Sequence, residues 1–135
     1  MATAPAQTTA MRAASWISAI NVLVAAGFSL AGLISPKAIL PVDYAPTEAS
    51  FLFAVYAAAR AIPLALVTLA AIYRRSASAL LVLASLAGII QLADSSVGLL
   101  EHDVGKTLGP LAIAAAQFWA VFALWKSTQK SASIV

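Results

Sequence analysis

The chain contains no cysteine among its 135 residues, and only 10% of those residues are charged. Without cysteine, the protein cannot form disulfides, thiolate nucleophiles, iron–sulfur clusters or cysteine-ligated zinc sites. A typical soluble domain carries about 25% charged residues and about 45–50% apolar ones. This chain is instead 62% hydrophobic, with a mean hydropathy of +0.94. A domain of this size has too much surface to hide that excess from water, so the composition predicts one integral membrane domain.

Signatures of catalysis and of metal binding are also missing. The sequence has no Gly-rich phosphate loop, no G-x-S-x-G elbow and no H-E-x-x-H pair. Its single histidine, His102, lies between Glu101 and Asp103, where a solvated turn is a better interpretation than a metal site. No basic stripe with interleaved aromatic residues is present, which argues against a nucleic-acid partner. The sequence therefore names no reaction and no cofactor.

Four apolar runs are each long enough to cross a bilayer, which needs about 20 helical residues. The first run follows Arg12 and is interpreted as a retained helix rather than a cleaved signal peptide. Thr47 is a candidate N-cap for the second helix, and the second and third helices are separated by so short a turn that they should be antiparallel neighbours. The predicted fold is an all-α, four-helix transmembrane bundle. It has helices over residues 14–34, 50–73, 76–100 and 107–125, a domain over 14–125, and polar tails over 1–13 and 126–135.

Basic residues are distributed unequally between the two ends of this predicted bundle. The end with both termini would hold Arg12, Arg74, Arg75, Lys126 and Lys130, and the opposite end Lys37 and Lys106. Because Lys and Arg are enriched in the cytoplasmic loops of membrane proteins, both termini are predicted to be cytoplasmic. The expected location is a bacterial-type inner membrane, with the lipid bilayer as the main partner.

Arg60 is the most unusual residue, because it lies within an apolar run and its guanidinium stays charged at ordinary pH. A charge at the bilayer centre costs about 2.5–3.5 kcal/mol on insertion scales. Counting about 1.5 Å of rise per residue puts Gln91 and Gln117 at the depth of Arg60. The same count places Tyr56 and Asp94 together at a level nearer the outer face. We therefore predict a buried polar layer in which Asp94 is the partner of Arg60, with Asn21 below it.

This predicted layer has more than one functional interpretation. It can be a polar pocket for a small lipophilic or anionic ligand or for a proton, with His102 at its rim. It can equally be a buried Arg60–Asp94 pair that only joins two helices of an accessory or structural subunit. A third interpretation is a membrane oxidoreductase acting on a lipophilic substrate such as a quinone. Rows of small residues, such as Ala112, Ala116 and Ala120, fit packing within the bundle or contacts in a homo-oligomer or larger membrane complex.

The spacing Tyr56-x-x-x-Arg60, followed by Gln91-x-x-Asp94-Ser95 and His102, resembles small bacterial DoxX-like membrane proteins and related four-helix domains of unknown function. The resemblance covers residues 50–125. It implies a four-helix inner-membrane protein, and some such relatives are associated with quinone or thiol redox chemistry. Relatives often carry an acidic residue directly after the arginine, where this chain has Ala61, and the lack of cysteine argues against direct thiol chemistry.

Overall fold

The computed structural model describes residues 4–38, 40–41 and 43–133, and its long elements are four α-helices. Each contains a segment that is long and apolar enough to cross a membrane. The predicted all-α, four-helix bundle is thereby confirmed, and the protein is a small multi-pass membrane protein. The elements in chain order are α1 (Ala4–Ile34), the 3₁₀ helix η1 (Pro36–Ala38), α2 (Glu48–Tyr73), α3 (Ala77–Leu100) and α4 (Val104–Ala132).

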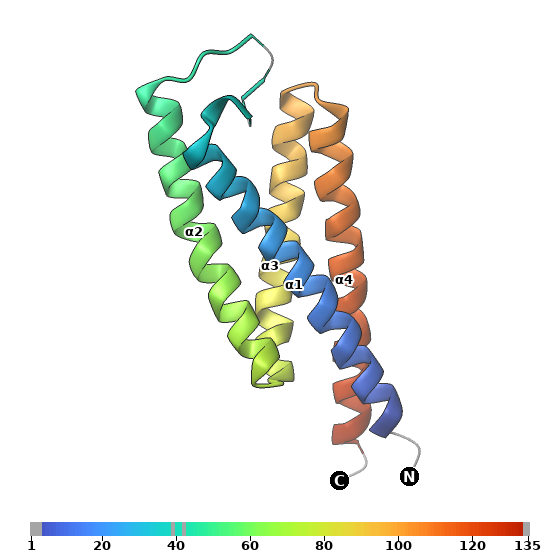
Figure 1. Cartoon of the computed structure of the whole chain (residues 1–135). Helices are drawn as coiled ribbons and strands as arrows, with labels where there is room; N and C mark the ends of the chain where they lie inside the picture. The colour runs from blue at the N-terminus through green and yellow to red at the C-terminus, as the bar shows by residue number, and fades with distance from the viewer. Residues whose placement is uncertain (1–3, 39, 42, 134–135) are drawn as a thin grey trace.

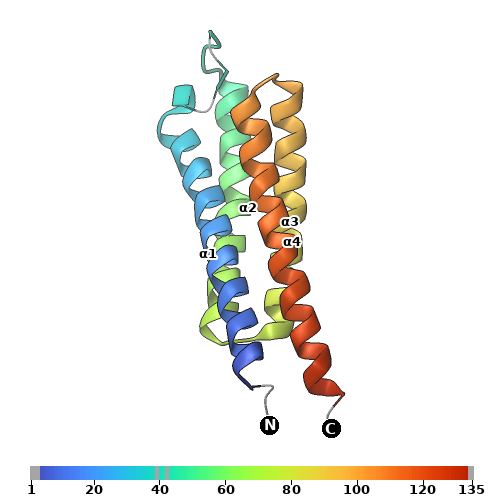
Figure 2. The ribbon, with the colours of Figure 1, turned by 90° about the vertical axis from the view of Figure 1, so that its right-hand side faces the viewer.

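The two ends of the bundle differ in what they contain (Figures 1 and 2). Both termini and the α2–α3 turn lie at one end, called the terminal end below. The connection from α1 to α2 and the α3–α4 turn lie at the other, called the loop end. α1 crosses the bundle obliquely and packs against both α2 and α4 (Figure 1). α3 and α4 are in contact along their lengths, whereas α2 and α3 meet near their turn and diverge toward the loop end.

The start of α2 follows the predicted capping chemistry. The Ser50 amide donates to Thr47 Oγ1 at 3.1 Å, and the Thr47 amide donates to Ser50 Oγ at 2.9 Å. These reciprocal bonds form a capping box, which satisfies two amides that a helix start would otherwise leave without partners. Thr47 is therefore confirmed as the N-cap.

The turn between α2 and α3 has only three residues. Arg75 adopts a left-handed backbone with φ of 52°, and its amide donates to the Ile72 carbonyl at 3.0 Å. The Ser76 amide donates to the Ala71 carbonyl at 3.0 Å, which completes a Schellman motif. The Ser76 hydroxyl then accepts from the Ala79 amide and caps α3. Ser76 thus takes part both in the end of α2 and in the start of α3.

The α3–α4 turn repeats this arrangement. His102 takes the left-handed position with φ of 55°, and the Asp103 amide donates to the Gly98 carbonyl at 3.0 Å. The Asp103 carboxylate accepts from the Lys106 amide at 3.0 Å and caps α4. Because this cap comes directly after the turn, α4 begins at Val104, earlier than the residue at which the apolar run begins.

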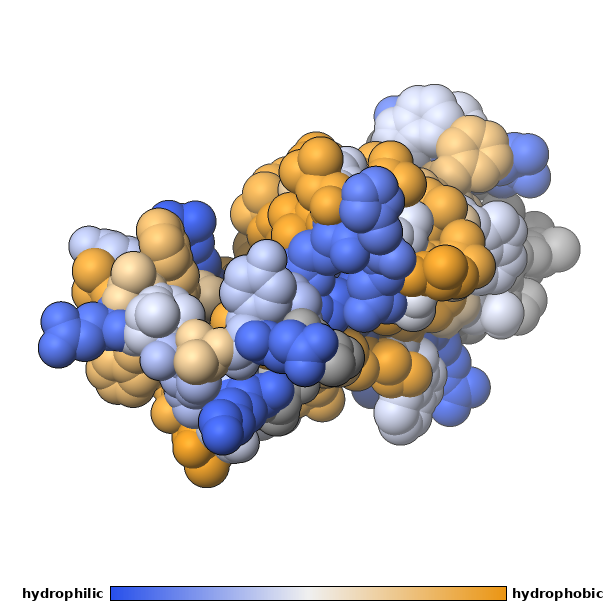
Figure 3. Space-filling view, turned by 90° about the horizontal axis from the view of Figure 1, so that it is seen from above, coloured by the Kyte–Doolittle hydropathy of each residue, from blue (hydrophilic) through white to orange (hydrophobic). Residues whose placement is uncertain are grey.

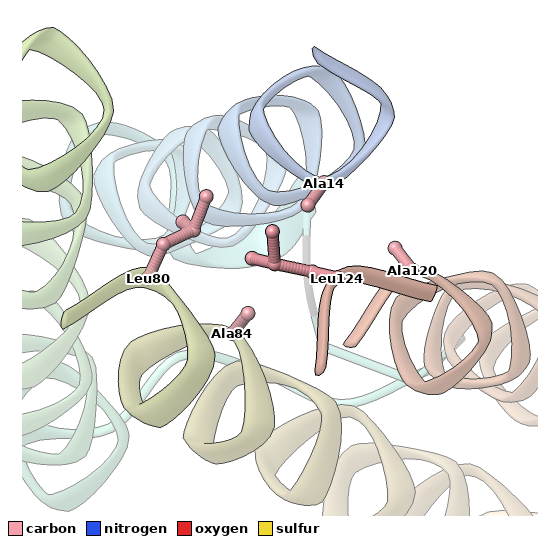
Figure 4. Close-up of a cluster of buried hydrophobic side chains, with 5 residues drawn as sticks. All are labelled: Ala14, Leu80, Ala84, Ala120 and Leu124. Carbon is pink, nitrogen blue, oxygen red and sulfur yellow. The ribbon is translucent and has the colours of Figure 1, made fainter. Parts of the chain in front are cut away.

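Small residues bring the helices close together in the core. One cluster lies where α1, α3 and α4 meet near the terminal end (Figure 4), and its members are Ala14, Leu80, Ala84, Ala120 and Leu124. A second cluster joins α1, α2 and α3 through Val22, Ala65 and Ala87, with Leu64 packed against it. Since lipid tails are as apolar as these side chains, such close packing is a main source of helix association in membranes.

A very close helix contact lies near the loop end, where α3 meets the start of α4. A Cβ atom added at Gly98 would lie 2.3 Å from the Lys106 carbonyl carbon and 2.6 Å from the Thr107 amide nitrogen. One turn away, the Ser95 hydroxyl donates to the Thr107 carbonyl at 2.8 Å. This approach therefore requires glycine at position 98.

The outer surface of the bundle is apolar. Many large side chains are exposed on the helix flanks, among them Trp16 at 71%, Phe28 at 66% and Phe53 at 71%. Seen from the loop end, hydrophilic groups gather on the end face, and hydrophobic surface lies around it (Figure 3). This distribution suits flanks that contact lipid and ends that contact headgroups and water.

Candidate functional site

The structure does not contain the predicted buried Arg60–Asp94 pair. Both side chains are exposed, and neither takes part in an ion pair within the described part of the chain. The physical reason is the divergence of α2 and α3, which separates the helices at the level of these two residues. The prediction compared depths along the helices, but depth does not determine how far apart two helices lie.

The faces that α2 and α3 bury place both charges along the same seam. Arg60 lies one turn before Leu64, which packs against the second core cluster. Asp94 lies two turns after Ala87, a member of that cluster. The two charged residues therefore lie on the same helix faces by which α2 and α3 approach each other nearer the terminal end. We call the exposed surface at this position, carrying Arg60 and Asp94, the α2–α3 seam.

A buried polar network does form, but its centre is Asn21 of α1. Gln91 Nε2 on α3 donates to Asn21 Oδ1 at 2.5 Å, and Asn21 Nδ2 donates to Gln117 Oε1 on α4 at 3.0 Å. Gln117 Nε2 in turn donates to Ser18 Oγ at 2.9 Å. Each of these four side chains is at most 4% exposed. The network ties α1, α3 and α4 together inside the bundle.

The predicted layer is thus partly right in its members and wrong in its centre. Gln91 and Gln117 do meet at one level, but through Asn21 rather than around Arg60. The expectation that Asn21 lies below the layer is wrong, because α1 crosses the bundle obliquely and brings this residue between α3 and α4. The predicted layer lacks Ser18, although its position three residues before Asn21 puts both on one helical face.

The chemistry available to this network is limited to hydrogen bonding. Its groups are three amides and one hydroxyl, none of which changes charge at ordinary pH. Hydrogen bonds between membrane helices are typically worth about 0.6 kcal/mol each and at most about 1.7 kcal/mol. The network is therefore suited to fixing how the helices pack, and it holds no group that could carry a proton or bind an anion by charge.

The remaining predicted site residues do not join the network. Tyr56 is exposed on α2, one turn from Arg60, and His102 is exposed in the turn at the loop end. Beside that turn, Lys106 Nζ pairs with Glu101 Oε2 at 2.6 Å. Across residues 4–38, 40–41 and 43–133, no group of three potential ligand side chains could hold a metal ion.

One further buried polar group lacks a partner. Thr68 of α2 is fully buried, and its hydroxyl makes no hydrogen bond to any residue that the structure describes. A buried hydroxyl without a partner costs free energy, because it loses its hydrogen bonds to water and gains none in return. The network of α1, α3 and α4 thus has no counterpart on α2.

Two hollows in the bundle are lined by none of these residues. One, of about 460 Å³, is an apolar groove formed by α3 and α4, lined by Leu81, Val82, Ser85, Leu86, Ile89, Val121 and Trp125. The other, of about 640 Å³, lies at the terminal end and has both polar and apolar walls, lined by Met11, Arg12, Ser15, Ile72, Arg75, Ala77 and Leu124.

Comparisons of the chain with protein-family models, with curated proteins and with solved structures find no match. The class that the fold defines is therefore a small four-helix, multi-pass membrane protein.

Proposed function

We propose that the protein is a non-catalytic assembly subunit of the membrane, and that its α2–α3 seam binds a second copy of the chain. The single observation behind this proposal is the exposure of two opposite charges, Arg60 and Asp94, well inside the helices and without ion-pair partners in the described chain. The neutral network around Asn21 joins α1, α3 and α4, and the second core cluster adds α2, so these charges are not needed to hold the helices together.

Both charges are costly to leave in contact with lipid. A charge at the centre of a bilayer costs about 2.5–3.5 kcal/mol on insertion scales, which is an upper bound for Asp94 because it lies nearer the end of its helix. A partner that offers the opposite charge at the same depth lowers this cost, because charge-assisted hydrogen bonds replace contact with hydrocarbon.

The seam is complementary to itself, which favours a second copy as the partner. A two-fold axis along the membrane normal preserves depth, so it can place Arg60 of each copy against Asp94 of the other. The depths of the two residues differ by an offset that a long arginine side chain can span. The same surface would then serve on both copies.

The absence of cysteine permits a direct test by cysteine cross-linking in membranes. Ala57→Cys places a thiol on the seam one turn before Arg60, and Val55→Cys places one on the opposite flank of the same helix as a matched control. We expect cross-linked dimers from Ala57→Cys and few from Val55→Cys. Arg60→Leu or Asp94→Val should each abolish them, whereas the exchange Arg60→Asp with Asp94→Arg should restore them. Equal cross-linking at both thiols, or none at either, would exclude this interface.

A second function is favoured by the position of Tyr56 beside Arg60 on the seam. A lipophilic anion, or a quinone-like molecule, could be held laterally by Arg60 and Tyr56, with Asp94 exchanging a proton. Gln91 and Gln117 would support this site only by fixing the helices, and His102 would lie at its rim. The resemblance to DoxX-like proteins is compatible with this function.

The two functions differ in what accompanies the purified protein. The ligand site predicts a monomer from which mass spectrometry identifies a bound small molecule that Arg60→Leu releases. The assembly function predicts a dimer without such a molecule. Co-purification of a different membrane protein in place of a second copy would identify that protein as the partner.

A further inference from the structure

The larger hollow lies at the terminal end, between α1, the end of α2, the start of α3 and α4. Its volume of about 640 Å³ falls within the range of small-molecule sites. Arg12, Ser15 and Arg75 contribute polar groups to its wall, and Met11 and Ile72 contribute apolar surface. The wall therefore combines two cationic groups with a surface that suits hydrocarbon.

No acidic side chain is available at this end to neutralise the two arginines. Four of the five acidic residues lie at the loop end, and the fifth, Asp94, lies on the seam. Neither Arg12 nor Arg75 makes an ion pair with the residues that the structure describes. Arg74, Lys126 and Lys130 add further positive charge at the same end of the bundle. The charged side chains at this end are thus all basic.

An anion with an apolar tail satisfies both kinds of wall. Guanidinium groups match phosphate oxygens through paired, charge-assisted hydrogen bonds. The hollow lies where the membrane-crossing helices end, which is the depth of lipid headgroups. Basic pockets between membrane helices at that depth bind anionic headgroups.

We propose that this hollow binds the headgroup phosphate of an anionic phospholipid. Arg12 and Arg75 bind the phosphate, Ser15 supplies a hydroxyl, and the apolar wall holds the first part of an acyl chain. The site does not involve the α2–α3 seam, so it stands or fails independently of the proposed dimer.

The backbone of Arg75 provides a variant that removes the charge without threatening the fold. Its φ of 52° lies in the left-handed region, where glycine is favoured over any residue with a Cβ atom. Arg75→Gly therefore deletes the guanidinium while relieving the backbone. Arg74→Gln is the matched control, because it removes the same charge from the adjacent residue, which does not line the hollow.

The experiment uses the full chain in nanodiscs of phosphatidylcholine with increasing phosphatidylglycerol, and native mass spectrometry counts the lipids retained. We expect the wild type to retain phosphatidylglycerol over phosphatidylcholine. In Arg75→Gly and Arg12→Gln, retention should fall about tenfold further than in Arg74→Gln, which is the effect of one charge-assisted hydrogen bond. The unfolding temperature of Arg75→Gly should not decrease.

Three outcomes would overturn the proposal. Equal losses in Arg74→Gln and Arg75→Gly would mean that only the general surface charge attracts the lipid. Equal retention of phosphatidylcholine and phosphatidylglycerol would mean that the hollow does not select a lipid of net negative charge. Displacement of phosphatidylglycerol by equimolar inorganic phosphate would identify a soluble anion, rather than a lipid, as the ligand.

Discussion

Replacing Asn21 by leucine tests whether the neutral network holds the bundle together. Asn21 takes part in two hydrogen bonds between helices, with Gln91 and with Gln117. At about 0.6 kcal/mol on average and at most about 1.7 kcal/mol for each bond, Asn21→Leu should lower the free energy of unfolding by about 1.2–3.4 kcal/mol. Leucine keeps the branched shape of asparagine, so packing should contribute little of this loss.

The measurement is equilibrium unfolding of the purified protein in mixed micelles, with a double-mutant cycle that adds Gln117→Leu. Because the Asn21–Gln117 bond disappears in either single variant, the double variant should lose less than the sum of the two. Ser96→Ala is the control, because the exposed Ser96 hydroxyl bonds only to the Leu92 carbonyl of its own helix, at 2.9 Å. An Asn21→Leu variant as stable as Ser96→Ala, or strict additivity in the cycle, would refute the role assigned to the network.

Other parts of the fold give predictions that the same unfolding measurement checks. Gly98→Ala should lower the free energy of unfolding by about 1–3 kcal/mol, because the added Cβ would collide with the α4 backbone. Gly109→Ala should be neutral or stabilising, because a Cβ there would have nothing within 4 Å. Equal effects of the two substitutions would contradict the close approach at Gly98. Thr68→Val should raise the free energy of unfolding by about 1 kcal/mol, because it removes a buried hydroxyl that bonds to no described residue. A decrease would show that the hydroxyl stabilises the fold. His102→Gly should raise the free energy of unfolding by about 1 kcal/mol, because glycine adopts the left-handed backbone of this position without strain. A decrease in the free energy of unfolding would show that the imidazole makes a stabilising contact.

Most of the fold follows from simple features of the sequence. The four apolar runs, the Thr47 cap and the three-residue turn at Arg74 are local, and local chemistry determines helix ends. The start of α4 was predicted less well, since hydropathy marks where a helix enters lipid. The helix itself begins earlier, at Val104, because Asp103 caps it in the polar turn.

The candidate site was harder to predict, because it depends on which helices touch and at what angle. Depth correctly grouped Gln91 with Gln117, since both lie near the middle of neighbouring helices and both bond to Asn21. Depth failed for Arg60 and Asp94, because α2 and α3 diverge with distance from the turn that joins them. It failed for Asn21 because α1 crosses the bundle obliquely. Helix crossing angles come from side-chain packing across the whole interface, and residue counts along one helix do not contain them.

The composition of the central network has a consequence for how the protein would sense electrical conditions. A membrane potential does about 2.3 kcal/mol of work per 100 mV on an elementary charge that crosses the whole field. The amides of Asn21, Gln91 and Gln117 carry no such charge, so voltage leaves the centre of the bundle undisturbed. Arg60 and Asp94 carry the formal charges well inside the helices, and both lie on the flank. A voltage or a proton gradient would therefore act on the α2–α3 seam, the surface proposed to join two copies, before it acted on the fold of the bundle.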